Sequence, residues 1–194
     1  IKISRSVDNG KIWSPPADIT DQIYGKNCQD ERRRHWYGAF AASGRALQLR
    51  DGRIMFAMAV RTTPDWGGSL NNYVCYSDDG GVTWDVSTNA ADLDGDEAKL
   101  IELNDGTILM SIRNREKGKR KFCLSKDRGE TWGKSYLQQD IQDPACNGDI
   151  IRYSSIIDGA AKNILLHSIP DDASIRKNVS ILVSFDEGKS WPVK

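Results

Sequence analysis

The apolar positions of the chain fall in short runs separated by turn residues, and no long segment carries an apolar stripe with helical spacing. Such runs predict strands, and they form three groups of four. The expected strands are 45–49, 53–61, 71–77 and 83–87; then 98–103, 107–113, 120–125 and 131–137; then 148–154, 162–168, 177–184 and the residues from Ser190 onward. The chain is therefore expected to be all-β.

A repeated motif, Ser-x-Asp-x-Gly-x-(Thr/Ser)-Trp, joins the third and fourth strands of each group. We call it the Asp box. The copies are Ser77–Trp84, Ser125–Trp132, Ser184–Trp191 and a weaker one, Ser6–Trp13, in which Ile12 replaces the hydroxyl residue. Its Asp and hydroxyl side chains can bond nearby amides, its Gly can adopt a positive φ, and its Trp can anchor a small hairpin. A catalytic group is needed once, so we interpret the repeated boxes as scaffold.

A second turn signal, Asp-Gly between apolar runs, predicts a hairpin between the first and second strands of each group. It occurs at Asp51-Gly52 and Asp105-Gly106, with a looser copy at Asp158-Gly159. Repeats whose period is tens of residues are typical of solenoids and propellers. Four antiparallel strands per repeat describe a propeller blade. At ~40–45 residues per blade, residues 1–194 should hold about four blades, two of them partial. Because a propeller ring has to close, we expect the chain to be the central part of one domain, incomplete at both ends.

Composition excludes several classes of function. The 27 basic and 27 acidic residues balance, so no nucleic-acid footprint is expected, and no apolar run approaches the ~18 residues of a membrane span. The basic cluster 32–35 is expected in a solvated loop. His35 and His167 show no ligand spacing, so neither a metal nor a cofactor is expected.

The four cysteines do not predict a disulfide framework. Cys75 and Cys123 each lie two residues before a box Ser, in successive repeats. Equivalent positions one blade apart are too distant for a bridge, so we expect buried free thiols. Cys28 and Cys146 lie in expected loops, and their state stays open.

Blade topology sorts the loops onto two faces. Asp-Gly turns and Asp boxes should lie on one face, and non-repeated functional residues on the other. That second face collects the segments 14–44, 62–70, 88–97, 114–119 and 169–176. Three residues there are candidates for a site: Glu97, Arg113 and Arg176. Trp66, with Asp65, could stack on a sugar or an acyl group, or serve as a loop anchor.

Asp boxes in a propeller resemble the sialidase (neuraminidase) family. The segment 95–114 resembles that family's Glu-to-Arg stretch, and 143–148 and 176–180 resemble stretches of bacterial exo-sialidases. The resemblance implies a six-bladed propeller and retaining hydrolysis of terminal α-linked sialic acids by a Tyr nucleophile. By the same resemblance, Glu97 assists that Tyr, and Arg113 and Arg176 are the second and third arginines that hold the substrate carboxylate.

The chain also departs from the family's pattern. The family's first Arg and its acid/base Asp have no match before the first box, and its nucleophilic Tyr should follow the last box. We therefore expect the 194-residue chain alone to be inactive. Two alternatives stay open: a non-catalytic propeller that binds glycans or proteins, and a trans-sialidase. The resemblance also implies sialylated glycans as partners and a secreted, periplasmic or cell-surface location.

Overall fold

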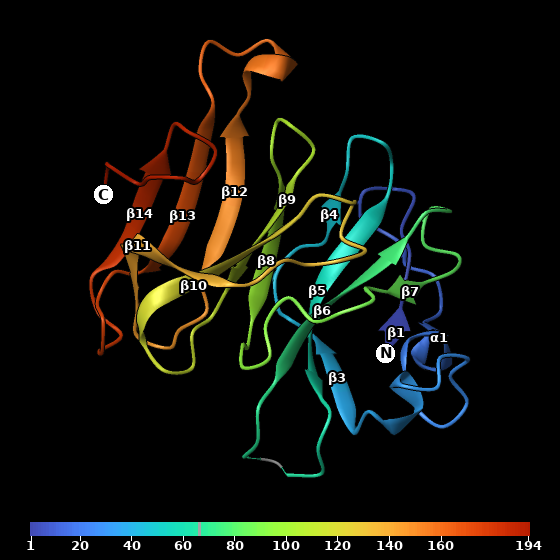
Figure 1. Cartoon of the computed structure of the whole chain (residues 1–194). Helices are drawn as coiled ribbons and strands as arrows, with labels where there is room; N and C mark the ends of the chain where they lie inside the picture. The colour runs from blue at the N-terminus through green and yellow to red at the C-terminus, as the bar shows by residue number, and fades with distance from the viewer. Residues whose placement is uncertain (66) are drawn as a thin grey trace.

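The computed structural model describes residues 1–65 and 67–194, and its regular structure is almost entirely β (Figure 1). None of the helices in this part of the chain is long and apolar enough to cross a membrane. The helical turns are α1 (Thr20–Ile23), η1 (Arg33–His35) and η2 (Ile156–Asp158). The strands are β1 (Lys2–Ile3), β2 (Ala17–Asp18), β3 (Gly38–Ala41), β4 (Leu47–Gln48), β5 (Ile54–Arg61), β6 (Asn71–Ser77), β7 (Asp85–Val86), β8 (Ala98–Glu102), β9 (Ile108–Ile112), β10 (Gly118–Ser125), β11 (Tyr136–Asp143), β12 (Asp149–Ser154), β13 (Ile164–Pro170) and β14 (Val179–Ser184).

Three antiparallel sheets follow one another in chain order, as the repeats predict. The first blade contains β3 to β7, the second β8 to β11, and the third β12 to β14 with an isolated bridge between Val183 and Val193. Strand β8 contacts both β5 and β12, so the second blade lies between the other two (Figure 1). The predicted all-β fold of four-stranded blades is confirmed. A ring of six blades stays a prediction.

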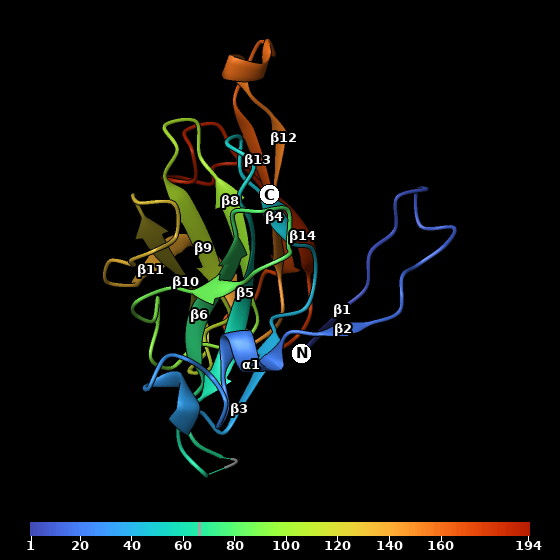
Figure 2. The same ribbon diagram turned by 90° about the vertical axis from the view of Figure 1, so that its right-hand side faces the viewer.

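The first Asp box lies in an arm that projects from the sheets. Strands β1 and β2 pair through Lys2 with Asp18 and Ile3 with Ala17, and the box joins them. Figure 2 shows this hairpin extending away from the rest of the molecule.

The fourth strand of the second blade, predicted at 131–137, is placed wrongly by the sequence pattern. The turn formed by the Asp box continues beyond Trp132, where the Gly133 amide donates to the Leu124 carbonyl at 3.0 Å. Strand β11 runs from Tyr136 to Asp143. An irregularity in β10 between Lys119 and Lys121 shifts the register of this pairing. Much of this outer strand is exposed and polar, so apolar periodicity does not reveal it.

The first strand of the first blade, predicted at 45–49, consists of two pieces. Both β3 and β4 pair with β5, and the chain leaves the sheet between them. Gly44 in this gap has φ +107°, and a Cβ there would lie 2.5 Å from Cε of Lys99. The departure thus makes room for a buried lysine of the next blade, which no local pattern announces.

The basic cluster 32–35 also differs from expectation. Arg33 lies in η1 and is only 8 % exposed. Its Nη2 bonds to Asp85 Oδ1 at 2.8 Å, and its Nη1 bonds to the Gln22 carbonyl. Arg33 therefore connects the segment 14–44 to the first blade and does not face solvent.

Side chains that alternate along the central strands hold the blades together. In β9, Ile108, Met110 and Ile112 pack toward the first blade, whereas Leu109 packs toward the third. This two-sided burial explains the apolar run of β9, which only Ser111 interrupts, since a sheet covered on both faces favours apolar residues at every position.

In the three Asp boxes that follow the first one, which we call the inner boxes, the Trp packs against the preceding blade or segment. Trp132 belongs to the cluster between the first and second blades, and Trp191 to that between the second and third. Trp84 packs beside the residues of β1 and α1. Trp13, in the projecting arm, is 60 % exposed.

Hydrogen bonds inside the box leave its Asp fully engaged. In the box of the first blade, Asp79 accepts the hydroxyls of Ser77 and Thr83, at 2.8 and 2.6 Å, together with the amides of Val82 and Thr83. These bonds, chiefly those from Thr83, hold the pKa of Asp79 below its ordinary value. A carboxylate so occupied supports the interpretation of the boxes as scaffold.

All four cysteines are free. Cys75 and Cys123 are fully buried, as predicted, and burial raises the pKa of Cys123 to about 11.

The Trp side chains of the Asp boxes differ in burial, and the buried Trp132 and the exposed Trp13 allow a paired test. Replacement of Trp132, which is 5 % exposed, by Ala should lower the free energy of unfolding by about 3–5 kcal/mol because it opens a cavity between two blades. The matched substitution Trp13→Ala should cost less than about 1 kcal/mol. Denaturant-induced unfolding measures both. Equal losses would show that the boxes stabilise their hairpins alone and not the blade interface.

Candidate active site

The non-repeated loops gather at one end of the sheets. The β5–β6, β9–β10 and β13–β14 loops lie at the lower end in Figure 1, and the β4–β5, β8–β9 and β12–β13 turns lie at the upper end. The loops contact one another: Arg115 Nη1 bonds to the Gly68 carbonyl at 2.9 Å, and the Gly118 amide bonds to the Ala173 carbonyl at 3.0 Å. The expected division into two faces is confirmed, and we call this end the loop face.

Glu97 and Arg113 meet on the loop face because they flank paired strands. Ala98 pairs with Ile112 across β8 and β9, so the preceding and following residues are also opposite each other. The Arg113 amide donates to the Glu97 carbonyl at 2.9 Å, and Arg113 Nη1 lies 2.5 Å from Glu97 Oε2. The two side chains are 22 % and 24 % exposed, so ligands can reach a partly desolvated ion pair.

A second carboxylate, that of Asp96, shares Arg113. Its Oδ2 lies 3.3 Å from Arg113 Nη1. Burial opposes the charge of Arg113, but the hydrogen bond that Arg113 donates to Glu97 and the charge of Asp96 prevail and raise the pKa of Arg113. Burial also raises the pKa of Asp96, although attraction to Arg113 counters part of this effect. Arg113 is thus a permanent cation with two acidic neighbours.

Arg176 lies on the same face but makes a different contact. It belongs to the β13–β14 loop and donates from Nη2 to the Ala145 carbonyl at 2.9 Å. Ala145 lies in the crossing from β11 to β12. The structure therefore joins Arg176 to this crossing, and the expected convergence of Arg113 and Arg176 on one ligand stays a prediction.

Of the remaining candidates, Asp65 lies in the β5–β6 loop and Trp66 lies outside the described residues. Asp65 Oδ1 accepts the Gly67 amide at 2.9 Å, which stabilises its own loop. Its role as a ligand contact stays a prediction.

Sequence reasoning missed a buried polar cluster beneath the loop face. Arg120 and Asp143 form an ion pair without exposed surface, and Ser111 and His167 extend it. The sequence carries a signal: Ser111 interrupts an apolar run, and Arg120 stands close before another. Polar residues at such positions have to find buried partners.

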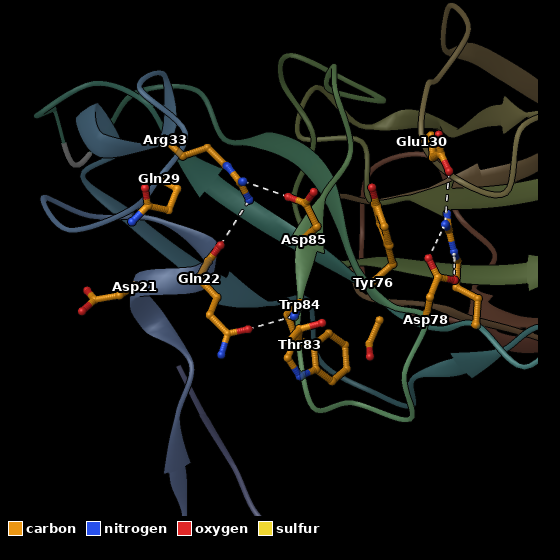
Figure 3. Close-up of a pocket in the computed structure, with 12 residues that line it drawn as sticks. Asp21, Gln22, Gln29, Arg33, Tyr76, Asp78, Thr83, Trp84, Asp85 and Glu130 are labelled. Atoms are coloured by element: carbon orange, nitrogen blue, oxygen red, sulfur yellow. Dashed lines mark hydrogen bonds and ion pairs between the residues drawn. The ribbon is translucent and has the colours of Figure 1, made fainter.

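Of the hollows on the described surface, two bear on the position of the site, one near each end of the sheets. The first, about 630 Å³, adjoins the box of the first blade (Figure 3). Arg53 there lies 2.7 Å from Asp78 and 3.1 Å from Glu130, and its side chain is only 3 % exposed, whereas that of Arg113 is 22 % exposed. The second, about 430 Å³, includes Tyr37, Phe40 and Asp96. It therefore adjoins the Arg113 cluster on the loop face.

Among residues 1–65 and 67–194, no group of three or more His, Cys, Asp or Glu side chains could hold a metal ion. The chemical capacity of this face is instead that of a positive guanidinium, suited to an anionic ligand, beside a carboxylate suited to proton transfer.

The chain is similar to known proteins both in sequence and in structure. Residues 1–194 match the family described as BNR repeat-like domain. The chain is similar to a sialidase of Bacteroides fragilis, 28 % identical over 97 % of this chain and 33 % of the relative. It is 33 % identical to a sialidase of Micromonospora viridifaciens over 98 % of this chain and 29 % of that protein. The solved structure of the Hadza microbial sialidase Hz136 superposes with a TM-score of 0.83 at 27 % identity, covering 98 % of this chain and 35 % of that one. The chain thus spans about a third of the length of these relatives.

Because Asp96 and Glu97 both contact Arg113, the pKa of Asp96 should depend on Arg113. Asp96 should titrate above its ordinary pKa of 3.8, and Arg113→Gln should raise its pKa further, because Arg113 is its main attractive neighbour. Arg115→Gln, the matched control, should raise it less, since Arg115 acts more weakly. Carboxyl chemical shifts followed by NMR against pH measure each value.

The same shift has a consequence for stability. Because the pKa of Asp96 is raised in the folded state, its contribution to stability is present below the unfolded value of 3.8 and is lost as pH rises through the folded pKa. An Asp96 that titrates at or below 3.8, or that ignores Arg113→Gln, would contradict the assigned contacts.

Proposed function

The chain belongs to the BNR repeat-like domain family, and we propose that the protein containing it is an exo-α-sialidase. Its reaction would be hydrolysis of terminal α-linked sialic acids from glycoconjugates, with retention of configuration. The observation that carries this proposal is the Glu97–Arg113 pair on the loop face. The similarity to sialidases over nearly the whole chain supports it.

Arg113 suits the recognition of sialic acid, whose carboxylate is attached to the anomeric carbon. A planar guanidinium can bind a carboxylate through two parallel hydrogen bonds, and its charge does not titrate. The position of Arg113 at the end of β9 fixes its backbone by the bond to Glu97. Arg176, from the next blade, would give the carboxylate a second cationic partner.

Glu97 suits a role in proton transfer. A carboxylate nucleophile would be repelled by the substrate carboxylate, so a neutral phenol that loses its proton during attack is the better nucleophile. Glu97 would accept that proton, as a general base held beside the anomeric centre. The nucleophilic Tyr, the acid/base Asp and the first Arg are assigned to no residue of this chain.

The expected substrate indicates where the protein acts. Terminal sialic acids are carried by glycans outside cells, so we place the activity in a secreted, periplasmic or cell-surface protein. The partners would be sialylated glycans, with no cofactor in the reaction.

Kinetics of the full-length protein test these roles. Arg113→Lys keeps the charge but loses the planar fork, so kcat/KM for a fluorogenic sialoside should fall by at least about tenfold. Glu97→Gln should lower kcat by roughly 10²–10⁴-fold, the range of general acid–base groups. Arg128→Lys, on the box side and 45 % exposed, is the matched control and should leave both constants unchanged.

The outcomes separate the competing functions. A wild-type protein that binds sialylated glycans without turnover would favour a non-catalytic propeller. Transfer of sialic acid to an added sugar acceptor in preference to water would favour a trans-sialidase. Unchanged kinetics after Arg113→Lys would remove the main support for carboxylate recognition.

A further inference from the structure

A fully buried ion pair lies beneath the loop face, at the boundary between the second and third blades. Arg120 of β10 and Asp143 at the end of β11 expose none of their side chains, and Arg120 Nη1 lies 3.0 Å from Asp143 Oδ2. Burial of two charges costs free energy that their attraction repays only in part. Stability alone therefore gives little reason for this pair, and its hydrogen bonds have to be considered one by one.

The first bond leads to Arg113. Asp143 Oδ2 accepts the backbone amide of Asn114 at 3.0 Å, and Asn114 follows Arg113 directly. The Asn114 side chain in turn donates to the carbonyls of Lys117 and Lys119, which closes the β9–β10 loop. The buried carboxylate thus fixes the direction in which the chain leaves β9 just after Arg113.

The second set of bonds leads to Arg176. Asp143 Oδ1 accepts the amide of Cys146 at 2.9 Å, and Arg120 Nη1 donates to the Cys146 carbonyl at 2.9 Å. Both backbone polar groups of Cys146 are therefore held by the ion pair. The preceding residue, Ala145, supplies the carbonyl that accepts Arg176 Nη2.

A third set ties the pair to both strands that lead to the arginines. Arg120 Nε donates to Ser111 Oγ at 2.9 Å, and Ser111 precedes Arg113 by two residues in β9. Ser111 Oγ also lies 2.9 Å from Nε2 of His167, which belongs to β13 of the third blade. Burial keeps the pKa of His167 well below its ordinary value, so the ring is neutral and can accept the hydroxyl hydrogen.

We propose that Arg120 and Asp143 form a positioning unit that sets the relative placement of Arg113 and of the crossing that receives Arg176. The unit acts through backbone groups adjacent to the two arginines and touches no substrate itself. Its role in catalysis rests on the proposed function, since the two arginines matter together only if they bind one carboxylate. Its effect on the loops does not.

Hydrogen exchange of the chain tests the structural half. Asp143→Asn keeps the shape but removes the charge that two amides and Arg120 share, so amide exchange in 113–118 and 143–147 should accelerate by roughly tenfold or more. The matched control is Asp78→Asn, which removes a carboxylate from Arg53, the buried arginine of the box end. That variant should leave exchange in both segments unchanged.

A double-mutant cycle in the full-length protein tests the catalytic half. Asp143→Asn should raise KM for a sialoside by about tenfold with a smaller change in kcat, because it disturbs carboxylate binding. In an Arg113→Lys background the same substitution should cost about twofold or less, since residues that act through one contact are not additive. A merely structural loss would be of equal size in both backgrounds and would also follow Asp78→Asn.

Each result decides a separate point. Unchanged exchange in the two segments, or an equal change in the control, would overturn the positioning unit. If the wild-type protein cleaves no sialoside, the proposed function fails and exchange alone decides the positioning. If Asp143→Asn does not fold, Ser111→Ala, which removes only the bond to Arg120 Nε and the His167 contact, should accelerate exchange in 113–118 more than Asp78→Asn does.

Discussion

The packing of each blade against the one before it is the constraint on which the rest of the structure depends. A single four-stranded sheet cannot bury its apolar faces, so each blade is stable only between neighbours. The inner Asp boxes serve this need directly, because the box turns its Trp into the seam with the preceding blade, as Trp132 and Trp191 show. The same box residues therefore form the turn and stabilise the stacking of the blades.

The same arrangement explains why the candidate site lies at the opposite end. At the box end the turns repeat and their charges pair with one another, as Arg53 does with Asp78 of its own blade and with Glu130 of the next blade. The loop face carries no repeated turn, so each blade can present different side chains there. Glu97 and Arg113 occupy the first available positions beyond a paired hairpin, where rigid strands hold them but solvent reaches them. A site built in this way combines fixed backbone with partial desolvation, which strengthens its charge interactions.

How far the sequence predicts this structure depends on how local each feature is. The boxes, the Asp-Gly turns and the apolar run that predicts a strand at 107–113 are local, and all were predictable. Strand β11 carries Gln or Asp at five of its eight positions, so only its pairing with β10 defines it. The same limit applies to Arg33, whose burial follows from a contact with Asp85 far along the chain. A basic cluster in sequence gives no sign that one of its members is needed to hold a crossing in place.

The two arginines of the candidate site also show that local sequence predicts only local geometry. Arg113 could be placed opposite Glu97 because a hairpin fixes that relation within one blade. The place of Arg176 relative to Arg113 depends on the crossing after β11, which Asp143 and Arg120 hold from below. Nothing local in residues 143–147 specifies that geometry, since it arises from an ion pair with a strand more than twenty residues earlier. A site shared by two blades therefore needs buried polar contacts between loop and sheet, because apolar packing fixes how blades stack but not where a loop carbonyl points.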